Sequence, residues 1–454
     1  MIRPPKAEAR AKLPATATVS FMGMEDLGID VKIAGSPHTR TLQAVAGSYT
    51  YFADGDVLLA KITPCFQNGK LGIARGLKNG VGFGSSEFIV LRPHAGLDAE
   101  YLYYFLSRED FRRGGVLRMG GSVGQQRVPQ EYVEQQRIPL PPLPEQHRIV
   151  AILDEAFAAI ATAKANAEKN LQNARALSES VLDNAISGRA TEMWRNHNGE
   201  AEQGSRVLQR ILSQRRGRHG STADYQQPAP AATVDLPQIP STWVYATVEQ
   251  LLRDDSGLAY GILKPGEPDP GGVPMIRVMD IGRGRMNDTE IFKVTKKLSD
   301  EFKRTILEEN DIMLAVMATV GRCAIVPSHL VGANVNRALA VLKLAKGISV
   351  KYVLLALLSP RIQSLFQKNK VGAAQARINL TELRRYAIPL PPLAEQHAIV
   401  ERVEVVQDRI EHLESLMAQK LAALEAVKVS LLHHAFSGRL TAGSAEQALA
   451  TAYP

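Results

Sequence analysis

One thirteen-residue phrase occurs twice in this chain of 454 residues, and it constrains the fold more than any other feature. Residues 138–150 read IPLPPLPEQHRIV and residues 388–400 read IPLPPLAEQHAIV, so the copies lie 250 positions apart and differ at two positions. A repeat at this distance is far longer than the period of a solenoid. It predicts two large units, each of which ends in the same structural element.

The repeat continues beyond this phrase without a gap. SVLDNAISGRAT begins at Ser180 and SLLHHAFSGRLT begins at Ser430, while GQQRV at 124–128 matches AQARI at 374–378. Further upstream the two halves diverge. The order along the chain is therefore a variable unit, a shared segment, a second variable unit and a second shared segment.

The shared segments are predicted to form long helices. Each begins with Leu-Pro-Pro-Leu, which is extended because proline restricts the residue before it, and a glutamate follows that suits the positive end of a helix. Gly188 and Gly438, in the Ser-Gly-Arg that ends each segment, are typical helix stops. The stretch from Glu145 to Ser187 has no internal proline and predicts a helix of roughly 65 Å.

Apolar residues in both helices recur at steps that alternate mostly between three and four, which is the pattern of a coiled-coil seam. One seam is rich in alanine and the other is bulky, so the two can pack closely on each other. One seam position is polar in both copies, at Asn170 and Lys420, and is expected to set the register. The alternative is two separate amphipathic helices, each packed on its own domain.

The composition is that of a globular protein from a reducing compartment. Hydrophobic residues make up 45% of the chain, which is ordinary for a protein with real cores. Cys65 and Cys323 lie far apart and belong to no CxxC or Cys/His cluster, which disfavours a disulfide framework or a zinc site. The sequence shows neither an apolar signal core nor an apolar run of membrane-spanning length, so a cytoplasmic location in a prokaryote is expected.

The two variable units are predicted to be mixed α/β. Short β-rich runs, such as EFIVLRP at 87–93 and RALAVLKL at 337–344, are separated by glycine-rich turns. Helices are expected before the shared segments, at 99–113 and at 350–368.

A linker is expected between the first shared helix and the second unit. Residues 191–240 are polar and rich in proline, which is typical of such connections. Their basic run at Arg215, Arg216 and Arg218 could touch phosphates, but a solvated loop is the favoured interpretation.

Polar and basic side chains gather in the turns of both units, and the net charge of +8 mildly favours a polyanionic partner. Arg, Lys, Asn and Gln are the side chains that grip phosphates and read base edges. In the first unit the candidates for DNA contact are Lys61, Gln67, Asn68, Lys70, Ser85, Ser86, Arg118, Ser122, Gln125, Gln126 and Arg127. In the second unit they are Arg277, Arg283, Arg285, Arg322, Asn334, Asn336, Arg337, Gln375 and Arg377. Taken singly, each of them is also an ordinary solvated surface residue.

The sequence carries no recognisable catalytic motif. It has no Walker motif, HExxH, GxSxG or Asn/Asp-Pro-Pro-Tyr signature, and DIGRGRM at 280–286 lacks the strand–GxGxxG–helix frame. His147 and His397 fall in the first turn of each shared helix, where their repetition makes them part of the helix start rather than a ligand pair. We therefore expect no catalytic residue, metal site or cofactor in this chain.

These features together resemble the specificity subunit of type I restriction–modification systems. The resemblance rests on the doubled IPLPPLxEQHxIV phrase, the long helix that ends in Ser-Gly-Arg, and the variable unit before each. Four further phrases resemble common ones of target recognition domains: AKITPCFQNGKLGIA at 60–74, FGSSEFIVLRP at 83–93, ATVGRCAIV at 318–326 and LPQIPSTW at 236–243. The resemblance covers nearly the whole chain.

The resemblance implies an α+β fold: two mixed α/β target recognition domains separated by two long antiparallel coiled-coil helices, arranged as a pseudo-twofold repeat. Each domain would read one half of a split, asymmetric site in double-stranded DNA. The helices would hold the domains apart and dock two methyltransferase subunits, which would carry S-adenosylmethionine and methylate adenine N6, and motor–nuclease subunits would join for restriction. The candidates for helix start and partner docking are Pro141, Pro142, Leu143, Glu145, Gln146, Pro391, Pro392, Leu393, Glu395 and Gln396.

The two recognition domains are not expected to be equally complete. The second opens with LPQIPSTWVYATVEQLL, for which the first has no equivalent, so the first is expected to be shortened at its start. The expected boundaries are 1–138 for the first recognition domain, 139–190 for the first spacer helix, 191–240 for the linker, 241–388 for the second recognition domain, 389–440 for the second spacer helix and 441–454 for a C-terminal tail.

Two other functions remain open at this point. The chain could be a coiled-coil scaffold that joins two ligand-binding domains without touching DNA. It could also be a methyltransferase or nuclease whose motifs are unfamiliar.

Overall fold

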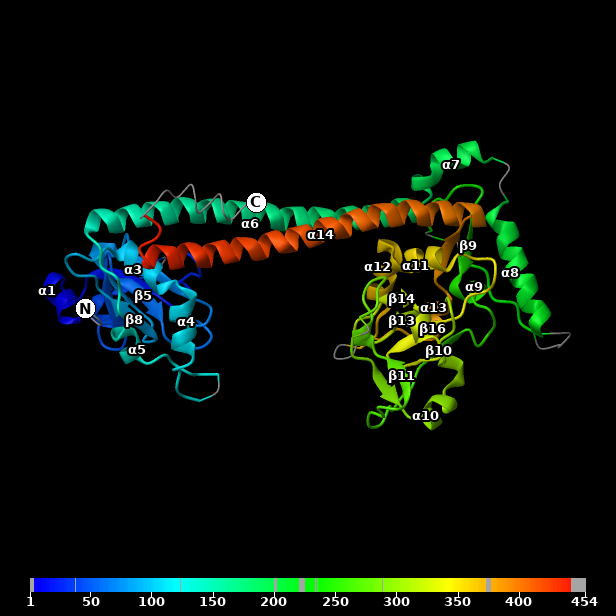
Figure 1. The fold of residues 1–454 in the computed structure, drawn as a ribbon, viewed down its shortest axis with the longest axis horizontal. Helices are drawn as coiled ribbons and strands as arrows, with labels where there is room; N and C mark the ends of the chain where they lie inside the picture. Colours follow the sequence, from blue (N-terminus) through cyan, green and yellow to red (C-terminus); the bar gives the residue numbers. More distant parts are fainter. Residues whose placement is uncertain are drawn as a thin grey trace. The chain divides into compact units, whose positions relative to one another are not determined.

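The structure is a computed structural model, and it describes residues 4–36, 38–122, 124–199, 202–219, 225–232, 234, 236–287, 289–372 and 377–441. The chain divides into two units: unit 1 is Met1–Lys169 with Met417–Pro454, and unit 2 is Asn170–Leu416. Each unit therefore contains one of the variable regions together with part of both long helices (Figure 1).

Unit 1 contains two four-stranded mixed sheets. Its strands are β1 (Thr18–Met22), β2 (Ile33–Ala34), β3 (His38–Thr41), β4 (Thr50–Ala53), β5 (Val57–Ala60), β6 (Leu71–Ala74), β7 (Val81–Gly84) and β8 (Phe88–Leu91). Its short helices are α1 (Ala7–Lys12), α2 (Leu42–Val45), α3 (Ala99–Leu106), α4 (Glu109–Val116) and α5 (Gln130–Glu134), with a 3-10 turn η1 (Lys78–Gly80). The strand orders are β3-β1-β7-β4 and β2-β6-β5-β8, in which β1–β7 and β2–β6 are parallel.

Strand β5 shows why these runs are apolar at every position. Val57 and Leu59 join the core cluster that contains α3, whereas Leu58 and Ala60 point to the opposite face and pack with Phe52 of β4. Successive residues of a strand point to opposite faces, so a strand covered on both sides has no polar side.

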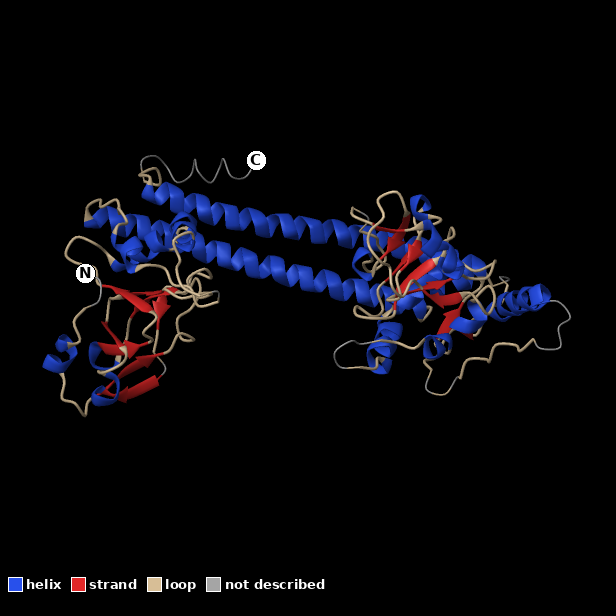
Figure 2. Cartoon of the chain, turned by 90° about the horizontal axis from the view of Figure 1, so that it is seen from below, coloured by secondary structure: helices blue, strands red, loops and turns tan. Residues whose placement is uncertain are grey.

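Unit 2 also contains β-sheets and short helices, but its strand orders differ from those of unit 1. Its strands are β9 (Val244–Thr247), β10 (Leu258–Tyr260), β11 (Val273–Ile276), β12 (Phe292–Val294), β13 (Ile312–Ala315), β14 (Cys323–Ile325), β15 (Asn334–Val335), β16 (Leu339–Leu342) and β17 (Ala387–Leu390). Its short helices are α7 (Glu192–His197), α8 (Gly204–His219), α9 (Val248–Leu251), α10 (Lys296–Glu301), α11 (Val350–Leu358), α12 (Pro360–Asn369) and α13 (Leu380–Arg384), with 3-10 turns η2 (Arg189–Thr191), η3 (Val278–Asp280), η4 (Lys303–Thr305) and η5 (Ser328–Leu330). The sheets are β10-β16-β13-β14, β12-β11-β15 and β17-β9. Figure 2 shows the strands of each unit gathered beside the helices.

The secondary structure predicted for the variable units is confirmed. Strands β8 and β16 lie within the two β-rich runs, and α3 with α4, and α11 with α12, occupy the two expected helical stretches. The mixed α/β character of both units follows from these elements.

The two long helices are α6 (Leu143–Ile186) and α14 (Leu393–Phe436), each of 44 residues. They begin two residues before the predicted glutamates, directly after the two prolines of each repeat. Gly188 and Gly438 follow their ends with positive φ values of 80° and 75°, a conformation that glycine adopts without steric cost. The prediction of two matched helices is confirmed.

The helices pair in antiparallel fashion. Within unit 1, Lys164 of α6 pairs with Glu425 of α14 at 2.8 Å. Within unit 2, eleven residues further along α6, Arg175 pairs with Glu414, eleven residues earlier in α14, at 3.6 Å. The heptad seam is visible in the burial of Ala167 and Ala174, whereas Asn170 and Lys420 are both exposed, so the predicted register-setting polar position does not lie within the seam.

Each long helix also completes the core of both units. The start of α6 (Ile149, Leu153) and the end of α14 (Leu432, Phe436) belong to one cluster with α3. The end of α6, with Ile186, belongs to the cluster of unit 2, as does the start of α14. The alternative of two helices that each pack only on their own domain is therefore wrong.

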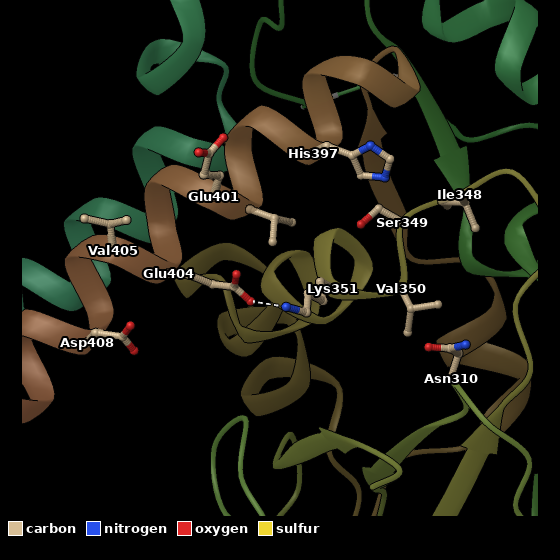
Figure 3. A pocket seen from close by; sticks show the side chains of 11 residues that line it. Asn310, Ile348, Ser349, Val350, Lys351, His397, Glu401, Glu404, Val405 and Asp408 are labelled. Carbon is tan, nitrogen blue, oxygen red and sulfur yellow. Dashed lines mark hydrogen bonds and ion pairs between the residues drawn. The ribbon is translucent and has the colours of Figure 1, made fainter. Parts of the chain in front are cut away.

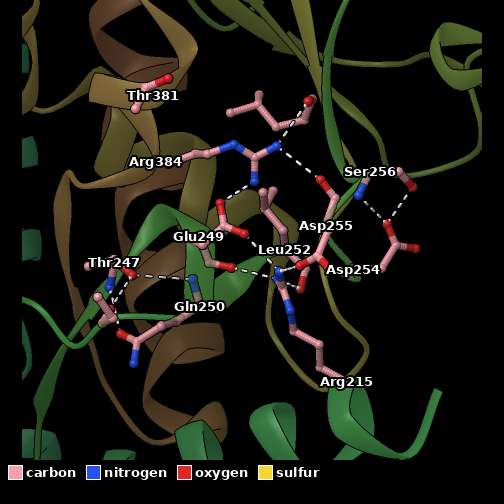
Figure 4. A network of polar contacts seen from close by, with 12 residues as sticks. Arg215, Thr247, Glu249, Gln250, Leu252, Asp254, Asp255, Ser256, Thr381 and Arg384 are labelled. Carbon is pink, nitrogen blue, oxygen red and sulfur yellow. Dashed lines mark hydrogen bonds and ion pairs between the residues drawn. The ribbon is translucent and has the colours of Figure 1, made fainter. Parts of the chain in front are cut away.

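The expected solvated linker is wrong for part of its length. Residues 204–219 form helix α8, and Arg215 of the basic run is 1% exposed. Figure 4 shows its guanidinium donating to the carbonyls of Glu249 and Leu252, at 2.8 and 3.2 Å, and to the carboxylates of Glu249 and Asp255. The Glu249 carboxylate also accepts from Arg384 of α13, so this network holds α8, α9 and α13 together. A buried, paired arginine of this kind is unavailable to DNA.

Candidate nucleic-acid interface

In unit 1, backbone hydrogen bonds hold together three segments that lie far apart in the sequence. The N–H of Lys61, directly after β5, donates to the carbonyl of Glu87 at 2.9 Å, and the N–H of Val128 donates to the carbonyl of Lys61 at 2.8 Å. Between Gly120 and Arg127 the chain folds back on itself through reciprocal bonds of 3.1 and 2.8 Å. We call these segments, 61–63, 85–87 and 120–127, the unit 1 cluster, of which 123 lies outside the described residues.

Several predicted DNA-contacting residues meet in the unit 1 cluster. The ammonium of Lys61 donates to the carbonyl of Ser86 at 2.8 Å, and the hydroxyl of Ser85 accepts from the N–H of Glu87 at 3.2 Å. Arg127 forms a fork with the Glu87 carboxylate, with two bonds of 2.9 Å. This guanidinium, with Lys61 nearby, holds the pKa of the Glu87 carboxyl below its ordinary value. Arg127 is thereby held in one orientation while its side chain stays exposed.

Four further candidates in the described part of unit 1 are exposed: Gln67, Asn68, Ser122 and Gln125. Gln126 is half-buried, and its carbonyl accepts from the N–H of Thr63 at 2.9 Å. Two other candidates bind backbone carbonyls of unit 1. Lys70 donates to the carbonyl of Met24 at 2.7 Å, and Arg118 donates to the carbonyl of Gly114 at 3.0 Å. The exposed amides have the donors and acceptors that base edges and phosphates require.

Unit 2 repeats the arrangement. The N–H of Ile378 donates to the carbonyl of Val316 at 2.8 Å, and the N–H of Val316 donates to the carbonyl of Ala338 at 2.9 Å. Val371 and Arg377 form the reciprocal pair, at 2.9 and 3.1 Å. We call 316–317, 336–338 and 371–378 the unit 2 cluster, of which 373–376 lie outside the described residues. The candidate Gln375 falls in that gap.

The side chains of the unit 2 cluster differ from those of unit 1. Arg337 and Arg377 are exposed within it, and Arg322 is exposed directly before β14. Asn336 is half-buried, and its side-chain oxygen accepts from the N–H of Ala338 at 3.2 Å. Ala338 is the structural equivalent of Glu87. The Ala338 carbonyl accepts from the N–H of Val316, directly after β13, as the Glu87 carbonyl accepts from the N–H of Lys61, directly after β5.

Two candidates of unit 2 have structural roles instead. Asn334 is 0% exposed and donates to the carbonyl of Phe302 at 3.4 Å, so it cannot reach a nucleic acid. Arg277 pairs with Asp280 and donates to the carbonyl of Glu290 at 2.9 Å, which fixes the turn after β11. The sequence alone did not distinguish these residues from surface ones.

Arg283 and Arg285 are also placed away from the unit 2 cluster. Both line a hollow of about 590 Å³ whose other walls are α11, Ile325 and the unit 2 parts of α6 and α14. Arg285 pairs there with Glu411 of α14. These arginines face the long helices.

The helix-start residues divide into buried and exposed groups. Gln146 and Gln396 are both 0% exposed, which contradicts a docking role for them. The amide of Gln146 accepts from the N–H of Asp98, the N-cap of α3, at 2.9 Å and donates to the carbonyl of Pro141 at 2.8 Å. Gln396 makes the same two contacts, with Ser349 at 2.8 Å and with Pro391 at 2.9 Å. The shared contacts give both copies of the phrase one structural role, because each glutamine ties the start of a long helix to the start of an earlier helix, α3 or α11.

The remaining helix-start residues are more accessible in unit 1 than in unit 2. Leu143 is 41% exposed, Pro142 is exposed, and Pro141 and Glu145 are half-buried. In unit 2 the equivalent prolines, Pro391 and Pro392, are buried, Leu393 is half-buried, and Glu395 is 0% exposed. The Glu395 carboxylate accepts from the indole N–H of Trp243 at 2.8 Å and from Arg195 and Thr191 at 2.6 Å.

A second hollow, of about 790 Å³, lies between the start of α11 and the first turns of α14 (Figure 3). Glu401, Glu404 and Asp408 line one wall, and the ammonium of Lys351 pairs with Glu404 at 2.7 Å. Three carboxylates against one ammonium make this surface negative, which disfavours contact with phosphates.

Among the described residues, no group of three or more His, Cys, Asp or Glu side chains is arranged to hold a metal ion. No helix in the described ranges is both long and apolar enough to span a bilayer.

Comparison with known proteins places this geometry in a family. The family model for the type I restriction modification DNA specificity domain matches residues 35–172 and 264–425. The EcoBI specificity subunit of Escherichia coli is 28% identical over 308 residues, which are 67% of this chain and 58% of that protein. The EcoAI specificity subunit, also from Escherichia coli, is 27% identical over 414 residues, which are 79% of this chain and 68% of that protein. The chain thus spans little more than half the length of the first of these relatives.

Solved structures share the fold at lower identity. A chain from a study of complex assembly and conformational transition of the type I R-M system superposes with a TM-score of 0.67 at 19% identity, covering 94% of this chain and 93% of that one. The HsdS subunit from Thermoanaerobacter tengcongensis superposes with a TM-score of 0.50 at 19% identity, covering 94% and 92%. Two mixed α/β domains and two long antiparallel helices are thus a shared architecture. Because the family model matches both variable regions and both repeated segments over more than half of the chain, this protein belongs to the type I restriction modification DNA specificity family.

Proposed function

We propose that this chain is the non-catalytic sequence-specificity subunit of a type I restriction–modification complex, and that each unit reads one half of a split site in double-stranded DNA. The observation that carries the proposal is the recurrence of one cluster of three segments in both units. Each cluster presents exposed side chains on a backbone framework that is fixed by hydrogen bonds. A rigid framework with exchangeable side chains suits a surface that reads sequence.

The two half-sites are expected to differ. Unit 1 has the exposed amides Gln67, Asn68 and Gln125, and amides pair best with adenine edges. Unit 2 presents the arginines Arg337 and Arg377, and arginine pairs best with guanine or with phosphates. A chain with two different readers recognises an asymmetric site.

The partners follow from the family. We propose that two methyltransferase subunits bind this chain, that they carry S-adenosylmethionine and methylate adenine N6, and that motor–nuclease subunits join for restriction. We propose that DNA binds at the two clusters rather than at the hollow of Glu401, Glu404 and Asp408, because the negative charge of that hollow disfavours phosphates. Assembly and chemistry are thereby assigned to other chains, and sequence choice to this one.

The test is co-expression with a cognate methyltransferase subunit, followed by mapping of methylated adenines. We expect methylation at one split, asymmetric motif, none from this chain alone, and DNA binding by the complex that weakens steeply with salt, as phosphate contacts release counterions. Methyl transfer or cleavage by the isolated chain would favour an unrecognised enzyme. A complex that forms but shows no salt-sensitive DNA binding would favour the scaffold without DNA contact.

A further inference from the structure

The repeated phrase has two different environments. In unit 2, β17 pairs with β9 in antiparallel register, from Ala387 opposite Thr247 to Leu390 opposite Val244. In unit 1 the equivalent residues, 137–140, belong to no strand and have no strand partner among the described residues. Leu140 is accordingly 56% exposed, whereas its equivalent Leu390 is 0% exposed.

The framework beneath the two copies is nevertheless the same. The hydroxyl of Tyr101 donates to the carbonyl of Pro139 at 3.0 Å, and the hydroxyl of Tyr352 donates to the carbonyl of Pro389 at 2.7 Å. The glutamines that follow, Gln146 and Gln396, are buried with matching contacts. Unit 1 therefore holds the segment in place as unit 2 does, and only the covering strand differs.

In unit 2 the covering strand brings a tryptophan. Trp243, directly before β9, is 6% exposed and its indole N–H donates to Glu395 at 2.8 Å. Glu145 is the equivalent carboxylate of unit 1, and among the described residues nothing donates to its side chain. Exposed Leu140 and Leu143 beside this half-buried carboxylate form an apolar edge with one acceptor.

We propose that residues 137–145 of unit 1 are a docking site for an extended segment of another polypeptide. That segment adds as an antiparallel strand along 137–140, covers Leu140 and Leu143, and places a tryptophan indole on Glu145. The inference goes beyond DNA reading, because the docking site lies in the repeated segment and not in the unit 1 cluster. Addition of a strand to an exposed edge is a general mode of peptide recognition.

The expected sequence of the docked segment follows from the strand that covers the equivalent site in unit 2, and from one residue that differs between the two sites. The segment has the form Ile-Pro-x-x-Trp followed by a β-strand, as at 239–247. Arg137 stands where unit 2 has Ala387, so the strand residue opposite Arg137 is expected to be acidic or polar. A second copy of this chain is disfavoured as the source, because its Trp243 is already buried in its own unit 2.

The probe is a labelled peptide of residues 236–248, LPQIPSTWVYATV, titrated into the full-length chain. We expect saturable binding at one site per chain, because the equivalent site in unit 2 is filled. A peptide with Trp243→Ala is expected to bind at least tenfold more weakly. Peptide binding should also protect the amides of Ile138 and Leu140 from hydrogen exchange, since a new strand would bond to that edge.

Two variants of the protein locate the site. Glu145→Gln removes the charged acceptor and Leu140→Glu disrupts the apolar edge, and each should weaken peptide binding at least tenfold. Leu413→Glu, at a residue 37% exposed on α14 in unit 2, is the matched control and should leave binding unchanged. Circular dichroism of all variants shows whether they are folded.

Three results would overturn the inference. Absence of binding at millimolar peptide would show that the edge is not a docking site. Binding that Glu145→Gln and Leu140→Glu leave unchanged would place the peptide elsewhere. Concentration-dependent dimers that Leu140→Glu abolishes would identify a second copy as the occupant instead. None of these outcomes depends on DNA binding, so the test is separate from that of the proposed function.

Discussion

At the scale of single residues, the most informative comparison is between Glu395 and Glu145, which occupy the same place in the two repeats. Glu395→Gln should reduce the free energy of unfolding of unit 2 by about 1–3 kcal/mol, because it weakens buried bonds from Trp243 and Arg195. Glu145→Gln should change stability by less than about 0.5 kcal/mol, because its carboxylate is half-buried and no described donor reaches it.

Urea denaturation followed by circular dichroism measures both effects. Both tryptophans of the chain, Trp194 and Trp243, lie in unit 2, so their emission reports on that unit separately. If both variants lose the same free energy of unfolding, the buried hydrogen bonds of Glu395 do not add to the stability of unit 2.

A second residue-scale prediction concerns DNA. Arg377→Ala should weaken binding of the assembled complex, and if Arg377 grips a phosphate the slope of log affinity against log salt should fall by about 1. Lys351→Ala removes the same charge from the negative hollow near α14 and should leave both quantities unchanged. Filter binding across a salt series makes the measurement, and equal effects of the two variants would mean that only net charge matters.

The residue scale is also where sequence reasoning was weakest. Arg127 and Glu87 lie forty positions apart, and only the hydrogen bonds among three segments show that they form a fork. Asn334 and Arg277 have the same side chains as true surface candidates, and their burial or pairing depends on the turn that each one holds. Residue type indicates what a side chain can bind, whereas exposure is decided by tertiary packing.

At the scale of elements, the apolar periodicity predicted the long helices well, whereas the polar composition of the linker failed to predict helix α8. The bounds of α6 lay within two residues of the expected ones, because a proline pair before the helix and a glycine after it are local signals. Helix α8 was missed because its sequence is polar, and its stability comes from Val207, Ile211 and the buried Arg215. A single turn of apolar residues among charges is too weak a pattern to identify a packed helix.

The alanine-rich face of α6 gives a prediction at this scale. Ala174 is 3% exposed, so Ala174→Leu should overpack the helix pair and lower the free energy of unfolding by about 1–3 kcal/mol. Ala161→Leu, on the exposed face of the same helix, should change it by less than about 0.5 kcal/mol. Thermal denaturation compares them, and an equal or larger cost at Ala161 would contradict the assignment of the seam.

At the scale of the whole molecule, the repeat predicted that two units share one pair of helices, and this is the most secure result from the sequence. The function of the pair as a spacer can be tested by deleting residues 166–172 together with 417–423. This removes one heptad from each helix and keeps the partners Lys164–Glu425 and Arg175–Glu414 in phase. Each of the two helices then becomes shorter by about 10 Å.

We expect the methylated site to retain both half-sequences while the gap between them shortens by about three base pairs, since B-DNA rises about 3.4 Å per pair. Mapping of methylated adenines across a library of gap lengths gives the answer. An active deletion variant that still requires the original gap would show that the helices do not set it.

The sharing of helices has a consequence for synthesis. Ile149 and Leu153 of unit 1 are translated before unit 2, but Leu432 and Phe436, which close the same core, are translated only after it. All of unit 2 is translated in between, which at about 5–20 residues per second takes tens of seconds. During that interval the core of unit 1 lacks these side chains and exposes apolar surface. Unit 2, in contrast, already has Ile186 of α6 for its own core while it is being translated. The half that is made first is therefore completed last, and chaperones have the longest access to it.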